Sequence, residues 1–403
     1  MSSTLTVLLF LVYLAICCWL ILRSTKIRLT GIDRWQWIAF FLVKVLAGMF
    51  YGYWYAKQAV SDTWHFHQEG LIEAELLRTD PIRYWSYLVD DYLRKPGGML
   101  ASTGFWNDLR DNLMVKLVSL MDLLSGGRYY VNVVMYEWIT FWGLVYSALT
   151  FQTVKGFPMP GWAWLTCALL PSCLFWTSGI HRDGLVLLEL AYIFYLLTKP
   201  GSRGLKWWTG MGIMWGLLFL TRNYVAILLV PGMLALWPGN RPLRWGWVFG
   251  SIYIITIAAI CMLPAGREII LAKKVSFEAL EGNSRLPYLE IENNAASFIK
   301  TIPNSLARAV FFPEWKAGAS GMQILAAAEG WILLSGWLLV LILSCKNNLK
   351  PTPLGWLLIC FSISCLWIIG TIVPFSGAIV RYRAIFQYEL VFACCLQFRS
   401  KLL

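Results

Sequence analysis

Charged residues are scarce in this chain. They make up 14% of its 403 residues, whereas hydrophobic residues make up 58%. Soluble domains carry about a quarter charged residues, so a water-soluble fold cannot hide the apolar surface of this sequence. The sequence also lacks an internal repeat, a Gly/Ser linker and any separate polar domain. We therefore expect one integral membrane domain that covers residues 1–403.

The ten cysteines lack the spacing of a zinc site. All of them lie within or at the edge of apolar runs, which argues against disulfides and a structural metal. The net charge of +12 would suggest a nucleic-acid partner for a soluble protein. Here short loops between apolar runs hold most of the basic excess, so we expect membrane lipid as a partner and no nucleic acid.

Apolar runs that are long enough to cross a membrane recur along the whole chain. A run of about 17–25 residues crosses about 30 Å of hydrocarbon as a helix. The first run lacks the basic segment and the small-residue cleavage site of a signal peptide. The pattern predicts an all-α, polytopic transmembrane helical bundle of about eleven helices, at residues 5–22, 35–56, 129–151, 161–178, 184–198, 207–221, 224–237, 246–264, 330–345, 355–374 and 384–398.

Basic residues predict the orientation of these helices. If the N-terminus lies outside, every short inside loop carries Lys or Arg, which is the positive-inside pattern. The two large loops, 57–128 and 265–329, then both lie on the extracytoplasmic side. Within them, segments 109–124 and 296–312 predict amphipathic helices that lie in the membrane interface.

The first polar segment on the outer side, residues 61–69, directly follows the second expected span. It brings Asp62, His65 and His67 to the membrane surface, where they suit a general base or substrate binding. A helix end with solvated charge is the alternative. The two histidines with Asp62 or Glu69 also have the residue types of a divalent-metal site. We assign no metal ligand and keep a divalent ion as an open alternative.

The second polar segment places His181, Arg182 and Asp183 in a tight hairpin between apolar helices. Such residues are costly near the membrane unless they face water, one another or a substrate. One interpretation is substrate binding. The other is an Arg182–Asp183 pair that caps the following helix, with the carboxylate favoured near the helix N-terminus.

The remaining two polar segments contribute arginines. Arg222 lies between two apolar runs, so we expect it to have an anionic partner from the protein, the lipid or a substrate. Arg381 and Arg383 precede the last expected span, and their guanidinium groups suit bidentate binding of phosphate. Snorkelling of these two side chains to lipid headgroups is the alternative.

Several short motifs resemble the GT-C superfamily of membrane glycosyltransferases, which use polyprenyl-phosphate sugars and include protein O-mannosyltransferases and lipid A aminoarabinose transferases. Asp62 resembles the acidic motif that these proteins carry in the first large outer loop, although there it follows the first transmembrane helix rather than the second. Residues 171–184 resemble the Pro-Ser-x-x-x-Trp-x-Ser-Gly-x-x-(Lys/Arg)-Asp stretch of bacterial multi-spanning proteins encoded with polysaccharide genes. Two further motifs are similar to that group: Phe312-Pro313-Glu314-Trp315 and Arg381-Tyr382-Arg383.

The resemblance implies an inverting glycosyltransferase of the bacterial inner (cell) membrane with its active site on the extracytoplasmic side. A sugar would move from a polyprenyl-phosphate carrier to a glycan, lipid or protein acceptor, and no further cofactor is required. Asp62 would deprotonate the acceptor hydroxyl, and arginines would stabilise the departing phosphate. We assign substrate binding to His65, His67, His181, Arg182, Asp183, Arg222, Arg381 and Arg383. The alternatives are a polysaccharide polymerase or ligase, and a lipid or solute transporter.

Overall fold

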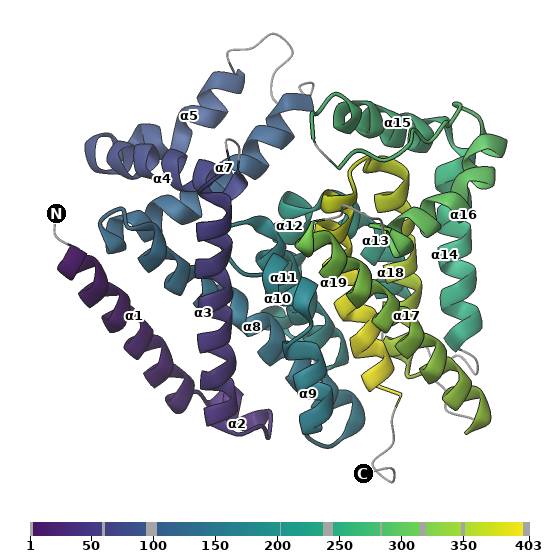
Figure 1. Ribbon diagram of the computed structural model, residues 1–403, viewed down its shortest axis with the longest axis horizontal. Helices are drawn as coiled ribbons and strands as arrows, with labels where there is room; N and C mark the ends of the chain where they lie inside the picture. Colours follow the sequence, from purple (N-terminus) through teal and green to yellow (C-terminus); the bar gives the residue numbers. More distant parts are fainter. Residues whose placement is uncertain are drawn as a thin grey trace. The chain divides into compact units, whose positions relative to one another are not determined.

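A computed structural model describes residues 3–58, 61–93, 103–201, 203–236, 245–282, 284–314, 320–347 and 351–397. Within these ranges the chain is helical, and its β-structure is confined to a single bridge between Arg285 and Phe375. The contacts divide the chain into two units, whose helices are labelled in Figure 1. Unit 1 comprises Met1–Thr153, Phe157–Met159 and Leu174–Asn223, and unit 2 comprises Val154–Gly156, Pro160–Cys173 and Tyr224–Leu403.

Five helices in the described part of the chain are long and apolar enough to cross a membrane. They are α1 (Ser3–Arg23), α3 (Arg34–Tyr55), α14 (Trp245–Met262), α17 (Gly321–Lys346) and α18 (Pro353–Ile372). The all-helical prediction and the presence of membrane-length helices are therefore confirmed, whereas the number of about eleven spans is not. Three of the other expected spans form helices of only 17, 17 and 13 residues: α11 (Arg182–Thr198), α12 (Leu205–Thr221) and α13 (Asn223–Ala235).

The expected span 161–178 is wrong as one continuous helix. It forms two short helices, α9 (Gly161–Ala168) and α10 (Pro171–Trp176). The break occurs at residues 169–170 because Pro171 lacks a backbone N–H and disfavours helical geometry at the residue before it. The last helix also differs from the prediction, because α19 (Ser376–Cys395) begins eight residues earlier than the expected start at 384.

The core of unit 1 includes helices from residues 57–128, the segment that was expected to form a large loop. It contains α1, α3, α11, α12, α2 (Thr25–Leu29), α4 (Asp62–Thr79), α5 (Pro81–Leu93), α7 (Thr103–Ser125) and most of α8 (Tyr129–Lys155). Helix α7 packs along α4 (Figure 1). A buried apolar cluster joins Phe66 of α4 to Met114 and Val118 of α7 and to Val133 of α8. The expected amphipathic helix at 109–124 is confirmed as part of α7, and its position in a membrane interface stays a prediction.

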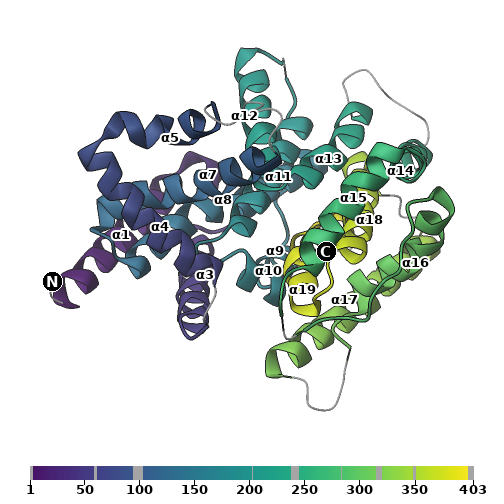
Figure 2. The same ribbon diagram turned by 90° about the horizontal axis from the view of Figure 1, so that it is seen from above.

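Unit 2 is centred on α18. This helix packs against α14, α19, α15 (Pro264–Glu278) and α16 (Ala295–Phe311), as Figure 2 shows from above. Gly370 permits the closest approach, because a Cβ atom there would overlap the carbonyl oxygen of Ser305 on α16. The amphipathic helix expected at 296–312 is confirmed as α16. The segment 265–329 is thus largely helical in its described part rather than an open loop.

Candidate functional site

Asp62 is the first residue of α4. The preceding residue, Ser61, caps this helix, since its Oγ accepts a hydrogen bond from the Trp64 backbone N–H at 3.4 Å. A carboxylate in the first turn is favoured by the positive end of the helix dipole. The Asp62 side chain is nevertheless exposed, so its position leaves the carboxylate accessible to a ligand.

A cavity of about 630 Å³ lies beside Asp62 at the junction of α3 and α4. Its lining combines two aromatic residues with one carboxylate, one imidazole and polar side chains: Tyr55, Ala56, Gln58, Ser61, Asp62, Trp64, His65 and Gln68. Pockets that bind small molecules have this character, with apolar and aromatic walls and a few polar groups that fix orientation. The volume is of the size that accommodates a small organic ligand.

Trp64 forms a fixed wall of this cavity. Its indole Nε1 donates a hydrogen bond to the Gly52 carbonyl of α3 at 3.0 Å. Its ring stacks on Tyr129 with a centroid separation of 4.1 Å and an interplanar angle of 18°. The Tyr129 hydroxyl in turn lies 2.6 Å from the Thr63 hydroxyl. These contacts hold the first turn of α4 against α3 and α8, so the wall that Trp64 forms is fixed in position.

The two histidines of the first segment do not meet at one point. His65 lines the cavity and is exposed, whereas His67 is buried. The Nδ1 atom of His67 lies 3.4 Å from Asp122 Oδ1, which also accepts a hydrogen bond from Asn132 at 2.6 Å. Residues two apart on a helix point in different directions. The environment of His67 therefore favours a packing role, and its assignment to substrate stays a prediction.

His181, Asp183 and Arg222 come together in unit 1. Arg222 Nη2 lies 2.6 Å from Asp183 Oδ1, and the carboxylate is buried. The Nδ1 atom of His181 caps α11 by accepting a hydrogen bond from the Asp183 backbone N–H at 3.3 Å. The Asp183 carboxylate thus supplies the anionic partner expected for Arg222. The imidazole ring packs on Tyr51 at 4.6 Å, and Tyr51 packs at the same centroid distance on Tyr55, which lines the cavity.

Arg182 has an acidic partner that lies far from it in the sequence. Its guanidinium forms an ion pair with Asp111 of α7 and lies 5.2 Å from the ring centre of Phe66. The alternative of an Arg182–Asp183 pair that caps α11 stays a prediction. Helix α7 brings the Asp111 carboxylate to Arg182, while Asp183 pairs with Arg222 at the end of α12.

A buried ion pair supports the hairpin that carries these residues. Lys44 Nζ lies 2.7 Å from Glu137 Oε2, and their side chains are 3% and 0% exposed. Lys44 also donates a hydrogen bond to the Thr177 carbonyl at 2.7 Å, and Glu137 accepts one from the Gly179 N–H at 2.5 Å. Gly179 has a φ angle of 86°, and a Cβ atom there would lie 2.5 Å from the Tyr51 ring. The pair therefore fixes the turn against α3 and α8.

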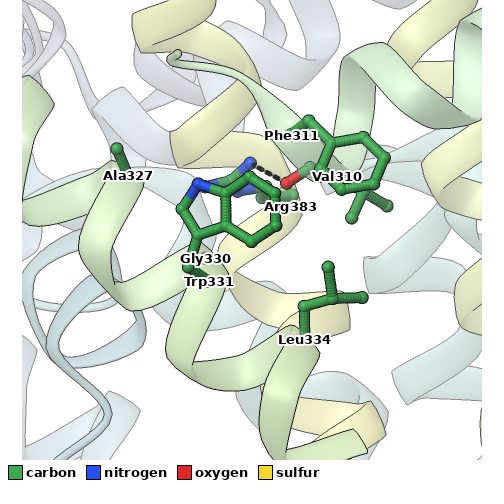
Figure 3. A pocket seen from close by; sticks show the side chains of 7 residues that line it. All are labelled: Val310, Phe311, Ala327, Gly330, Trp331, Leu334 and Arg383. Carbon is green, nitrogen blue, oxygen red and sulfur yellow. Dashed lines mark hydrogen bonds between the residues drawn. The ribbon is translucent and has the colours of Figure 1, made fainter. Parts of the chain in front are cut away.

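Arg381 and Arg383 belong to unit 2 and lie inside α19 rather than before it. Arg383 is buried, and its guanidinium donates hydrogen bonds to four backbone carbonyls, three of them at the end of α16. Figure 3 shows the bond to the Val310 carbonyl. The space around it leaves no volume for a water molecule. Because the side chains are two residues apart on a helix, they cannot form one fork. Arg383 thus completes the C-terminus of α16, which favours a structural role, and the phosphate-binding assignment of both arginines stays a prediction.

Sequence reasoning did not single out several residues that shape the site. Tyr55 and Gln58 line the cavity, and Asp111 forms an ion pair with Arg182. Tyr55 follows an aromatic run at the end of α3, which fits an interfacial belt equally well, so the sequence carries no distinct signal for it. Of the motif at 312–315, residues 312–314 are described and Trp315 lies outside the described residues.

No family model, no curated protein and no solved structure matches this chain.

Proposed function

We propose that this chain is a membrane glycosyltransferase that uses Asp62 as its general base. The proposal rests on one observation: an accessible carboxylate borders a cavity of about 630 Å³ whose walls carry Tyr55, Trp64, His65 and Gln68. Aromatic faces suit the apolar faces of a sugar ring, and amide and imidazole groups suit its hydroxyls. Membrane-length helices supply the setting in which a lipid-linked sugar donor is available.

The chemistry requires little more than this carboxylate. A base within hydrogen-bond reach of the acceptor hydroxyl removes its proton as the oxygen attacks the anomeric carbon. The bond to the lipid phosphate breaks on the opposite face, and the phosphate leaves as a stable anion without needing a general acid. Asp62 lines the cavity at the start of α4, so a bound acceptor can reach it. The extracytoplasmic orientation and the polyprenyl carrier belong to this proposal.

The experiment compares Asp62→Asn with the wild type in membranes supplied with a polyprenyl-phosphate sugar. We expect sugar transfer to fall by about 100-fold or more, the usual contribution of a general base, at unchanged protein level. Glu75→Gln is the matched control, because Glu75 is an exposed carboxylate on the same helix that does not line the cavity. Wild-type transfer by the Asp62 variant refutes the assignment. A product that grows by whole repeat units supports a polymerase instead, and sugar-lipid flux without covalent change supports a transporter.

A further inference from the structure

Another cavity lies in unit 2, where the C-terminal parts of α15, α16 and α18 meet. It has a volume of about 110 Å³. A water molecule takes about 30 Å³ of liquid, so the cavity has room for a compact group of several heavy atoms. Its lining is rich in cations: Lys274, Arg285 and Arg308 oppose the single carboxylate of Glu278. Three positive charges and one negative charge leave a net charge of +2.

Arg285 is held in place by the backbone before any ligand arrives. Residues 284–286 run beside the start of α19, where Leu286 N donates a hydrogen bond to the Pro374 carbonyl at 2.7 Å and Ser376 N donates one to the Ser284 carbonyl at 2.9 Å. One terminal nitrogen of Arg285 donates to the Glu278 and Leu280 carbonyls at 2.9 and 2.6 Å. The other N–H groups of this guanidinium donate to no described residue. A positioned cation of this kind binds with little loss of side-chain freedom.

Lys274 neutralises the negative charge of Glu278 in the cavity. Its ammonium forms an ion pair with Glu278 and lies 3.9 Å from the ring centre of Tyr288. The side chain is buried, so the pair is fixed. With the lysine and glutamate matched, the described lining holds no second carboxylate that could balance the two arginine charges.

Of the three cations, Arg308 has the fewest hydrogen-bond and ion-pair partners among the described residues. It lies in the last turn of α16, and its side chain is partly buried. Within the described residues its guanidinium donates no hydrogen bond and forms no ion pair at contact distance. Burial lowers the pKa of the Arg308 guanidinium, and the Glu278 carboxylate opposes that shift. Removing a charged group from water without hydrogen-bond partners is costly, so a ligand that supplies acceptors would stabilise this arrangement.

We propose that this cavity binds a phosphate group, taken either from a lipid headgroup or from free phosphate. Guanidinium groups offer planar pairs of N–H donors that match phosphate oxygens bidentately. A dianionic phosphate neutralises the net charge of the lining, and its oxygens accept hydrogen bonds from Arg285 and Arg308. The inference does not depend on the proposed transferase activity, because no residue of the Asp62 cavity takes part in it.

The test measures phosphate binding by the full chain in maltoside detergent micelles, which contain no phosphate. One arm titrates radiolabelled inorganic phosphate by equilibrium dialysis. The other incorporates phosphatidic acid and counts retained lipid by native mass spectrometry. Saturable binding in either arm supports the site, and the arm that responds identifies the source. If neither arm shows saturable binding, the proposal is overturned.

Variants locate the binding. Arg308→Gln should weaken affinity by about tenfold or more, as expected for loss of charge-assisted hydrogen bonds. Lys300→Gln removes a charge from an exposed position of the same helix and should change affinity by less than about twofold. Glu278→Gln should strengthen binding, because it removes the negative charge and frees Lys274. Equal affinity of the wild type and the Arg308 variant, or no gain from Glu278→Gln, contradicts the assignment.

Discussion

The buried pair between Lys44 and Glu137 allows a stringent test of the packing of unit 1. The two charged groups lie 2.7 Å apart and are almost completely buried. Coulomb's law with an effective dielectric constant of about 20 gives roughly 6 kcal/mol of attraction at that distance. Desolvation of both ions offsets much of this energy. Removal of one partner, however, leaves an uncompensated buried charge and costs about 3–5 kcal/mol.

We therefore expect Lys44→Met and Glu137→Gln each to lower the free energy of unfolding by about 3–5 kcal/mol. The double variant should be more stable than the sum of the two effects predicts, by about 2 kcal/mol or more, because neither ion is then left alone. The glutamine can still accept the hydrogen bond that Gly179 donates to Glu137. Helix content followed by circular dichroism in mixed micelles with increasing SDS gives the required unfolding curves.

Lys57→Met is the matched control, since Lys57 is exposed near the end of α3 and, among the described residues, bonds only to the Tyr53 hydroxyl at 3.0 Å. We expect it to change the free energy of unfolding by less than about 0.5 kcal/mol. If the effects of Lys44→Met and Glu137→Gln simply add, or if each is below about 1 kcal/mol, the two side chains do not form a coupled buried pair. The hairpin at 177–179 would then be held by contacts other than this ion pair.

Two further substitutions test unit 2 by the same unfolding measurement. Gly370→Ala should lower the free energy of unfolding by about 1–3 kcal/mol, because its Cβ would overlap the Ser305 carbonyl. The control Gly336→Ala on α17 meets no atom within 4 Å and should be neutral or slightly stabilising. Equal effects of the two substitutions would contradict the close contact of α16 with α18. Arg383→Met should lower the free energy of unfolding by about 3 kcal/mol or more, since it leaves buried carbonyls at the end of α16 without donors. Unchanged stability together with impaired phosphate use would support Arg383 as a phosphate ligand.

The sequence predicted the helices well where their signal is local. Hydropathy marks apolar runs residue by residue, so α1, α3, α14 and α18 lie close to the expected spans, whereas α17 begins nine residues before its expected start at 330. The break after α9 was not predicted, although Pro171 carries a local signal for it. The amphipathic segments that became α7 and α16 were found from their local hydropathy pattern. Their neighbours α4, α5 and α15 were missed because mixed composition does not distinguish a packed helix from a polar loop.

The sequence located Asp62, but it could not show which of its neighbours face the cavity. His65 and His67 have the same chemistry in the sequence, and only the rotation of α4 exposes the first and buries the second. Helical geometry separates residues that are two apart, so motifs such as His-x-His and Arg-x-Arg do not become sites by proximity alone. Arg381 and Arg383 diverge on α19 for the same reason.

The amino-acid sequence by itself determined that this chain is helical and has helices suited to a membrane, because composition and apolar run length act locally. Tertiary structure alone decided the partners of the charged groups. Asp183 forms an ion pair with Arg222 from the next helix, and Arg182 forms one with Asp111, which lies 71 positions earlier in the sequence. A buried charge must find its counterpart in three dimensions, and that choice depends on how helices far apart in the chain pack.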